Sequence, residues 1–110
     1  MKTISIRIND EYHELKLKKI IGALAVVENY GDYHSHFSRY KGYTIIHLPT
    51  MQKMLPSGMD LLRNCIKKAE QFIEILDFSK ITSPSDMKDL PVDTRQKLED
   101  IYYNRGIYAV

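Results

Sequence analysis

The sequence predicts a single α+β domain over residues 1–110, with an antiparallel sheet of about four to five strands packed against helices. Three observations support this fold class. Residues 3–8 alternate between apolar and polar side chains, which is the period of a half-buried strand. After residue 57 the apolar residues recur at helical spacing, first over a long segment and then over a shorter one. A chain of 110 residues has the length of one domain rather than two.

The first two strands are expected to form a β-hairpin over residues 3–18. In its second half, YHELKLKK, Leu15 and Leu17 share one face while charged residues occupy the other. Asn9 and Asp10 lie between the two halves, and both residue types tolerate the left-handed backbone angles of a tight turn. The β-branched residues of the following segment, IIGALAVVENY, predict a third strand over residues 20–30.

A second hairpin is expected over residues 33–48, with Lys41 and Gly42 as a two-residue turn. Glycine in the second turn position accepts the positive φ that a type I′ turn requires. Counting outward from this turn pairs residues across the two strands. The expected pairs are Tyr40 with Tyr43, Ser38 with Ile45, and His36 with His47.

This register directs the histidines and the paired tyrosines away from the core. The opposite face carries Phe37, Ile46 and Leu48, which are better candidates for burial. We therefore predict a binding surface on the outer face of the hairpin. Its residues are Tyr33, His34, His36, Arg39, Tyr40, Lys41, Tyr43 and His47.

The helical half begins with a predicted long helix over residues 58–77, whose apolar stripe is wide enough to lie across a sheet. Ser57 and Asp60 approximate a capping box at its start. Cys65 lies on the apolar stripe and is expected to be a buried hydrophobe rather than a reactive thiol. Three methionines between residues 51 and 59 are expected to fill gaps in the core, with an adaptable protein-binding patch as the alternative.

After the long helix, residues 79–90 predict a linker that contains one helical turn. A second helix is expected over residues 91–104, because Pro91 suits a first helical position and Gly106 suits a position just past the end. Its apolar stripe is thin, which is compatible with a homodimer or another partner. The final residues, GIYAV, are expected to add an edge strand or to dock on a groove.

Net charge, cysteine count and the length of the apolar runs exclude several classes of protein. The formal charge of +2 is compatible with a nucleic-acid partner but argues against a DNA mimic. The single cysteine excludes an intrachain disulfide and a cysteine-rich zinc site. The N-terminus lacks the apolar core of a signal peptide, and the longest apolar run is far below the roughly 18 residues that span a bilayer. A cytoplasmic protein without a membrane partner is therefore expected.

The predicted outer face admits four interpretations. It is an ordinary solvated sheet face, or a recognition surface on which tyrosines stack on bases and nearby cations contact phosphates. Its three histidines, joined by Asp32 or His13, have the spacing of a zinc site. Two opposed histidines also suit acid–base catalysis, for example of RNA cleavage.

We expect a small binding protein rather than an enzyme, because the sequence contains no glycine-rich phosphate loop and no catalytic triad. Size and composition suggest a phage or mobile-element regulator or inhibitor that acts on a host protein or nucleoprotein complex. A protein partner is expected, and neither a cofactor nor a bound metal. The alternatives are a nucleic-acid-binding module with a Tyr/Lys/Arg sheet face, and a histidine-dependent nuclease or phosphodiesterase.

Overall fold

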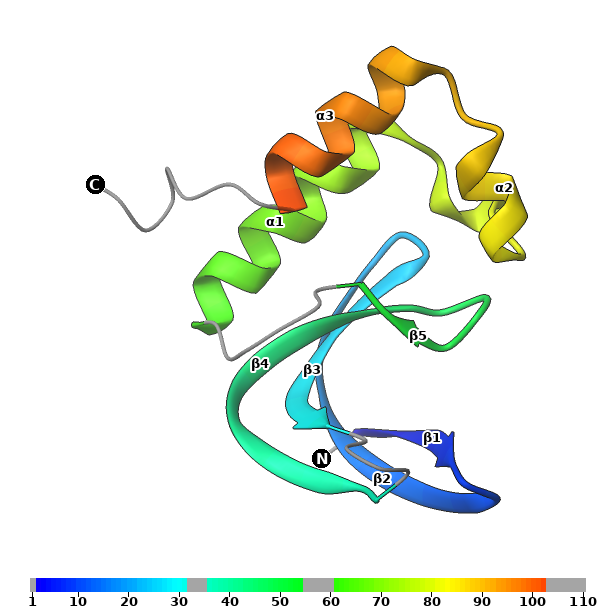
Figure 1. Cartoon of the computed structure of the whole chain (residues 1–110). Coiled ribbons are helices and arrows are strands. Elements are labelled where there is room, and N and C mark those ends of the chain that lie inside the picture. Colours follow the sequence, from blue (N-terminus) through cyan, green and yellow to red (C-terminus); the bar gives the residue numbers. More distant parts are fainter. Residues whose placement is uncertain (1, 32–35, 55–60, 103–110) are drawn as a thin grey trace.

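The computed structural model describes residues 2–31, 36–54 and 61–102 of the chain, and its N-terminal half is an antiparallel sheet (Figure 1). The sheet has five strands in the order β1-β2-β3-β4-β5, so each strand pairs with its neighbours in sequence. The strands are β1 (Thr3–Ile8), β2 (Glu11–Ile21), β3 (Leu24–Gly31), β4 (Ser38–His47) and β5 (Gln52–Lys53).

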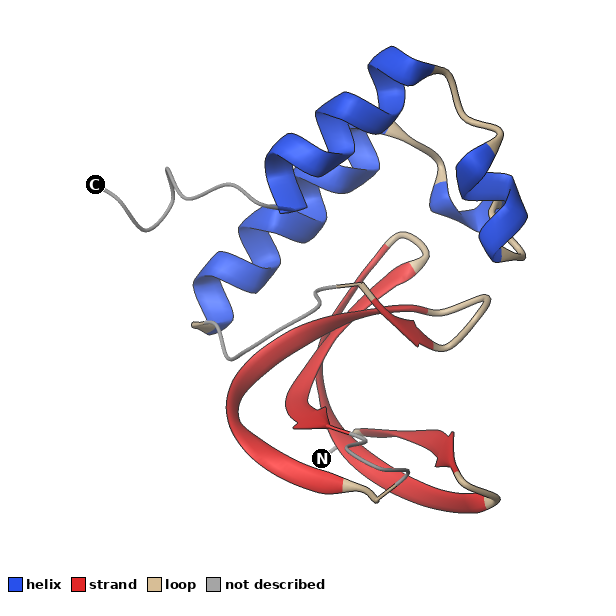
Figure 2. Ribbon diagram, viewed as in Figure 1, coloured by secondary structure: helices blue, strands red, loops and turns tan. Residues whose placement is uncertain are grey.

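The helices follow the sheet and cover one side of it, which confirms the predicted α+β fold class (Figure 2). They are α1 (Leu62–Ile75), the short 3-10 helix η2 (Phe78–Lys80), α2 (Pro84–Lys88) and α3 (Val92–Tyr102). In Figure 1 the sheet is strongly curled, and α1 and α3 lie side by side above it. No helix among the described residues is long and apolar enough to cross a membrane.

The first hairpin is confirmed. β1 pairs with β2, and the register places Ile4 opposite Leu15. Asn9 and Asp10 both have positive φ, 51° and 64°, as the predicted turn requires. The outer side chains of this hairpin are exposed, whereas Leu15 is fully buried, so its alternation corresponds to one buried face.

The third strand begins later than predicted. Ile20 and Ile21 end β2, and the chain turns at Gly22 before β3 starts at Leu24. Gly22 has a φ of 59°, a left-handed conformation that glycine adopts without steric cost. The segment IIGALAVV therefore holds two paired strand ends rather than one strand, with Ile21 opposite Leu24.

The second predicted hairpin is wrong. Lys41 and Gly42 lie inside β4, which is one strand that pairs with β3. Gly42 does have positive φ, 86°, but it lies where the β3–β4 register shifts between Glu28 and Tyr30. Its backbone freedom therefore serves a β-bulge and not a turn. The observed partners are Ile45 with Val26, Tyr43 with Glu28, and Arg39 with Tyr30.

The ranges predicted for the two longer helices agree with the structure over the residues that it describes. α1 lies within the predicted range, and the capping residues Ser57 and Asp60 lie outside the described residues. The linker contains two short helices rather than one turn. α3 begins directly after Pro91, whose carbonyl oxygen accepts a hydrogen bond from the Arg95 amide. The predicted helix end after residue 102 and the GIYAV segment lie outside the described residues.

The core consists of two clusters on opposite faces of β3 and β4. On the helix side, Leu24, Val26 and Ile45 are fully buried against α1, where Cys65 is also fully buried as predicted. On the inner side of the curl, the buried residues are Ile6, Leu15, Ala25, Val27, Tyr30 and Ile46. Phe37 and Leu48 are partly buried against this inner cluster, in agreement with their predicted core position.

Candidate functional site

The predicted binding surface is divided by the observed course of β4. Arg39, Tyr40 and Lys41 are exposed near the start of this strand, and His36 is exposed just before it. Tyr43 is only partly exposed and packs against the helix-side core, with the Lys18 ammonium 5.8 Å from the centre of its ring. Tyr33 and His34 lie outside the described residues.

Tyr40 is fixed on the surface by a contact with Gly31. A Cβ atom on this glycine would overlap the Tyr40 ring, so the ring lies directly against the glycine backbone. Half of the Tyr40 side chain still faces solvent, with 51% exposure. The neighbouring Arg39 is already engaged, because its guanidinium pairs with Glu28 and donates to the Glu14 carbonyl oxygen at 2.9 Å.

His47 does not belong to an outer face, which corrects the prediction. It lies at the end of β4 opposite Leu24, on the side that the helices cover, and only 5% of it is exposed. Its Nε2 lies 2.8 Å from the Phe78 carbonyl oxygen and its Nδ1 lies 2.8 Å from the Thr50 hydroxyl. Because a carbonyl can only accept, Nε2 carries the proton, and in the neutral ring the Thr50 hydroxyl donates to Nδ1.

The predicted pairing of His36 with His47 is therefore wrong. His36 precedes the start of β4, whereas His47 is the last residue of the same strand. Both ring nitrogens of His47 are occupied, so neither can ligate a metal or act as a base without breaking a hydrogen bond. Within residues 2–31, 36–54 and 61–102, no group of three or more His, Cys, Asp or Glu side chains could hold a metal ion.

His13 lies on the inner side of the curl. Its ring stacks on Phe37 with centroids 4.0 Å apart and an interplanar angle of 6°. Its Nε2 is buried without a hydrogen-bond partner among the described residues, although the Glu11 carboxylate lies 3.8 Å away. This histidine is thus a packing residue of the inner cluster rather than a member of an open site.

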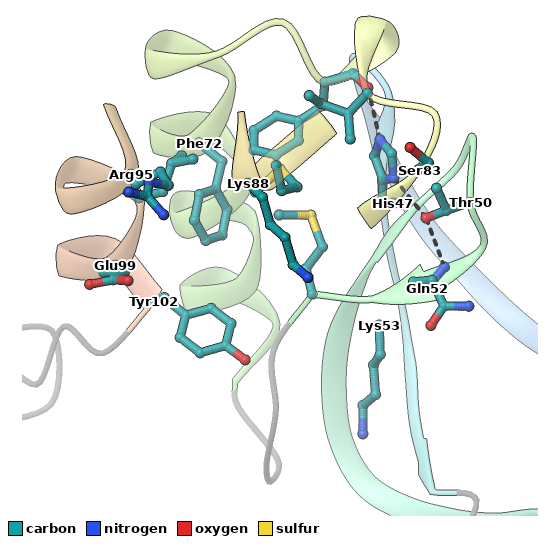
Figure 3. Close-up of a pocket in the computed structure, with 15 residues that line it drawn as sticks. His47, Thr50, Gln52, Lys53, Phe72, Ser83, Lys88, Arg95, Glu99 and Tyr102 are labelled. Carbon is teal, nitrogen blue, oxygen red and sulfur yellow. Dashed lines mark hydrogen bonds between the residues drawn. The ribbon is translucent and has the colours of Figure 1, made fainter. Parts of the chain in front are cut away.

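An open groove lies between the end of the sheet and the helices, with a volume of about 500 Å³ (Figure 3). The β4–β5 connection forms one wall, and α2 and α3 form the other. The apolar lining comes from five separate segments and consists of Met54, Phe72, Phe78, Ile81, Met87 and Leu98. The residues at its rim include two cations and one carboxylate, which are Lys88, Arg95 and Glu99.

Two carboxylates hold the short helices that shape the groove. Asp77 accepts hydrogen bonds from the Ser79 hydroxyl at 2.6 Å and the Ser79 amide at 3.1 Å, and these contacts lower its pKa. Asp86 forms the capping box of α2 and accepts from the amide and hydroxyl of Thr82, which lower its pKa as well. Both caps are local, so the short helices that carry Phe78 and Met87 are each closed by contacts within their own segment.

Three polar side chains that line the groove, those of His47, Thr50 and Lys53, already have hydrogen-bond partners. His47 and Thr50 bond to each other, and the Thr50 oxygen also accepts from the Gln52 amide at 3.4 Å. The Lys53 ammonium donates to the Tyr30 carbonyl oxygen at 2.7 Å, and Figure 3 shows this side chain directed away from the groove. An incoming molecule therefore meets mainly apolar contacts beside these three residues, whereas the Gln52 side chain, which also lines the groove, makes no hydrogen bond to another described residue.

Comparison with protein-family models, with curated proteins and with solved structures finds no match for this chain. The site must therefore be interpreted from its own geometry. Pockets that hold small molecules have volumes of about 300–1,000 Å³ and a mostly apolar lining with few polar groups. The groove meets both criteria, so it can remove an apolar group from water.

Two residues that the sequence predicted for binding line this groove, His47 of the predicted surface and Met54. Met54 belongs to the methionine-rich stretch before α1, for which an adaptable binding patch was the alternative to core packing. In the structure Met54 packs against the helix-side cluster and also lines the groove, so both interpretations apply to it. Met51 instead packs against the inner cluster, and Met59 lies outside the described residues.

Proposed function

We propose that this protein acts by binding, and that the groove between the sheet and the helices receives a small, largely apolar molecule. The observation that supports the proposal is an open cavity of about 500 Å³ with an apolar lining that reaches the surface. Apolar surface in contact with water is unfavourable by about 25 cal/mol per Å². A ligand that covers this lining removes that cost, which favours complex formation.

The arrangement supports binding more than catalysis. A general base needs a ring nitrogen or carboxylate within reach of a substrate. The histidine of the groove, His47, has both nitrogens in hydrogen bonds to Thr50 and Phe78. The alternative prediction of a histidine-dependent nuclease was based on a pair of opposed histidines, His36 and His47, and these two residues are not paired in the structure.

The proposal is tested with a neutral, solvent-sensitive dye such as Nile red, whose fluorescence rises in apolar surroundings. We expect saturable binding to the intact protein. Met87→Glu introduces a carboxylate among the lining residues and should weaken dye binding at least tenfold. The matched control is Ile20→Glu, which adds the same charge at a 57% exposed position of β2 away from the groove.

Circular dichroism and thermal unfolding establish that both variants fold. Equal dye affinity in Met87→Glu and Ile20→Glu would place the dye elsewhere and remove support for the groove. Absence of saturable binding to the intact protein would refute the proposal directly.

A second candidate is recognition by the exposed start of β4, which the sequence predicts. The observation that favours it is the Tyr40 ring, because its contact with Gly31 holds it in one place while half of it faces solvent. A ring held in this way is suited to stacking on a nucleic-acid base, which contributes about 1–3 kcal/mol. Binding of single-stranded RNA should then weaken with salt and with Tyr40→Ala; retained affinity in this variant would exclude stacking by Tyr40.

The role of regulator or inhibitor of a host protein or nucleoprotein complex stays part of the proposal. It is supported by the small size of the domain and by its exposed aromatic residues, among them Tyr12 at 71% and Tyr40 at 51% exposure. Tyrosine is enriched at protein interfaces because it offers a large apolar area with a polar end.

A further inference from the structure

We propose that the ligand of the groove is an amphipathic anion, with an apolar body on the lining and one negatively charged end at the rim. This inference rests on the proposed function, since it assigns the chemical class of the molecule that the groove receives. It follows from two independent features, which are the occupied polar groups of the floor and the charges of the rim.

Three polar side chains of the groove, those of His47, Thr50 and Ser83, are already bonded and so disfavour a ligand that is polar along its length. His47 and Thr50 are bonded to each other, and the second ring nitrogen of His47 is bonded to the Phe78 carbonyl. Ser83 is bonded to Ser85 at 2.8 Å. A polar group placed against these residues would lose its water and find few free partners, which is unfavourable. The buried part of the ligand must therefore be apolar.

The rim determines the charge of the remaining end. No side-chain hydrogen bond or ion pair joins Lys88 or Arg95 to another residue that the structure describes. In Figure 3 the Lys88 side chain extends across the groove toward the β5 wall. Glu99 is the one carboxylate among the described lining residues, so the described rim carries two cations against one anion. An anionic end is thus attracted, and a cationic end is repelled.

The expected preference for an anionic over a neutral ligand is small because the cations of the rim are exposed. Exposed ion pairs contribute little to affinity, and salt screens them. Two such contacts together should favour an anion over a neutral analogue by about threefold to tenfold at low salt. Most of the affinity should come from the apolar body, whereas the charge selects among ligands of equal size.

The experiment compares decanoate with decanol, which have the same chain length and differ in charge. Each displaces the neutral dye from the intact protein at low ionic strength, below the concentration at which decanoate forms micelles. We expect decanoate to displace the dye at a concentration about threefold to tenfold lower than decanol. The preference should disappear at 0.5 M salt, where the screening length falls to roughly 4 Å.

Variants assign the preference to the rim. Lys88→Met combined with Arg95→Met keeps the aliphatic length of both side chains and removes both charges. In this double variant decanoate and decanol should displace the dye at concentrations that are equal within about twofold, each expressed relative to the dye affinity of the variant itself. The matched control is Lys67→Met, which removes an exposed cation from α1 outside the groove and should preserve the preference.

The outcomes separate the two proposals. Dye binding with equal displacement by decanoate and decanol would overturn the anionic ligand and leave the groove as a binding site. A preference for decanoate that survives in the double variant would also overturn it, because the charge would then be recognised elsewhere. Absence of dye binding to the folded protein would overturn both the proposed function and this inference.

Discussion

The N-terminal hairpin and the central strand pair bury their side chains in different ways. In β1 and the first half of β2, one face is buried and the other is exposed, and the sequence alternates accordingly. In β3 and the second half of β4, both faces are buried, and the sequences LAVV and TII run continuously. The difference shows that alternation reports one-sided burial, whereas a continuous apolar run reports a strand enclosed by two layers.

The two sides of the central pair are covered by different parts of the chain. α1 covers the helix side with residues such as Phe72, which is 1% exposed and lies edge-on to Phe78 with centroids 6.0 Å apart. The curl of the sheet covers the inner side, where β1 and β2 supply Ile6 and Leu15. Opening either side should therefore destabilise the central strands.

The largest expected effect follows from opening the helix side. Phe72→Ala should lower the free energy of unfolding by about 3–5 kcal/mol, because a cavity replaces a fully buried ring. Chemical denaturation measures the loss. On the same helix, Ile73→Ala changes a side chain that is 38% exposed, and its effect should be about 1 kcal/mol or less. Equal losses in the two variants would contradict the assignment of Phe72 as the main cover of β3 and β4.

The same comparison explains which parts of the fold could be predicted. The first hairpin is a local feature, because its alternation and the Asn9–Asp10 turn lie within adjacent residues. The range of α1 is also local, since its apolar stripe recurs along one segment. Positive φ at Gly42 suits either a turn or a bulge, and the choice depends on pairing with β3, which lies earlier in the chain. The sequence around Gly42 does not contain that information.

The candidate site depends even more on distant residues. The burial of His47 is completed by Phe78, which is 31 positions away. The groove combines side chains from β4, β5, α1, η2, α2 and α3, and among the described lining residues only His47 and Met54 were marked for binding by the sequence. Exposed residues near the start of β4 were correctly expected on the surface, because Arg39 and Lys41 carry charges that resist burial.

The second expected effect concerns the polar residue on the helix side of β4. His47→Leu replaces the imidazole ring with an apolar side chain and leaves the Phe78 carbonyl and the Thr50 hydroxyl without their partner. We expect a loss of about 1–3 kcal/mol in the free energy of unfolding. His36→Leu is the control, since this histidine is exposed, and its effect should stay within about 0.5 kcal/mol. An unchanged free energy of unfolding in His47→Leu would show that the hydrogen bond to η2 adds nothing to stability.

The smallest expected effect has the opposite sign and lies on the inner side of the same strand. Thr44 is fully buried opposite Val27, and its hydroxyl has no hydrogen-bond partner among the described residues. Thr44→Val replaces this hydroxyl with a methyl group of similar size and should raise the free energy of unfolding by about 1–2 kcal/mol.

Thr3→Val provides the matched control, because Thr3 is exposed on β1 and the same exchange there should change stability by about 0.5 kcal/mol or less. Thermal and chemical unfolding of both variants measure the difference. Destabilisation by Thr44→Val would mean that the hydroxyl is satisfied in solution, for example by a buried water molecule. In that case Thr44 on the inner side of β4 would resemble His47 on the helix side, whose two ring nitrogens both have partners, and the contrast between these two residues would not hold.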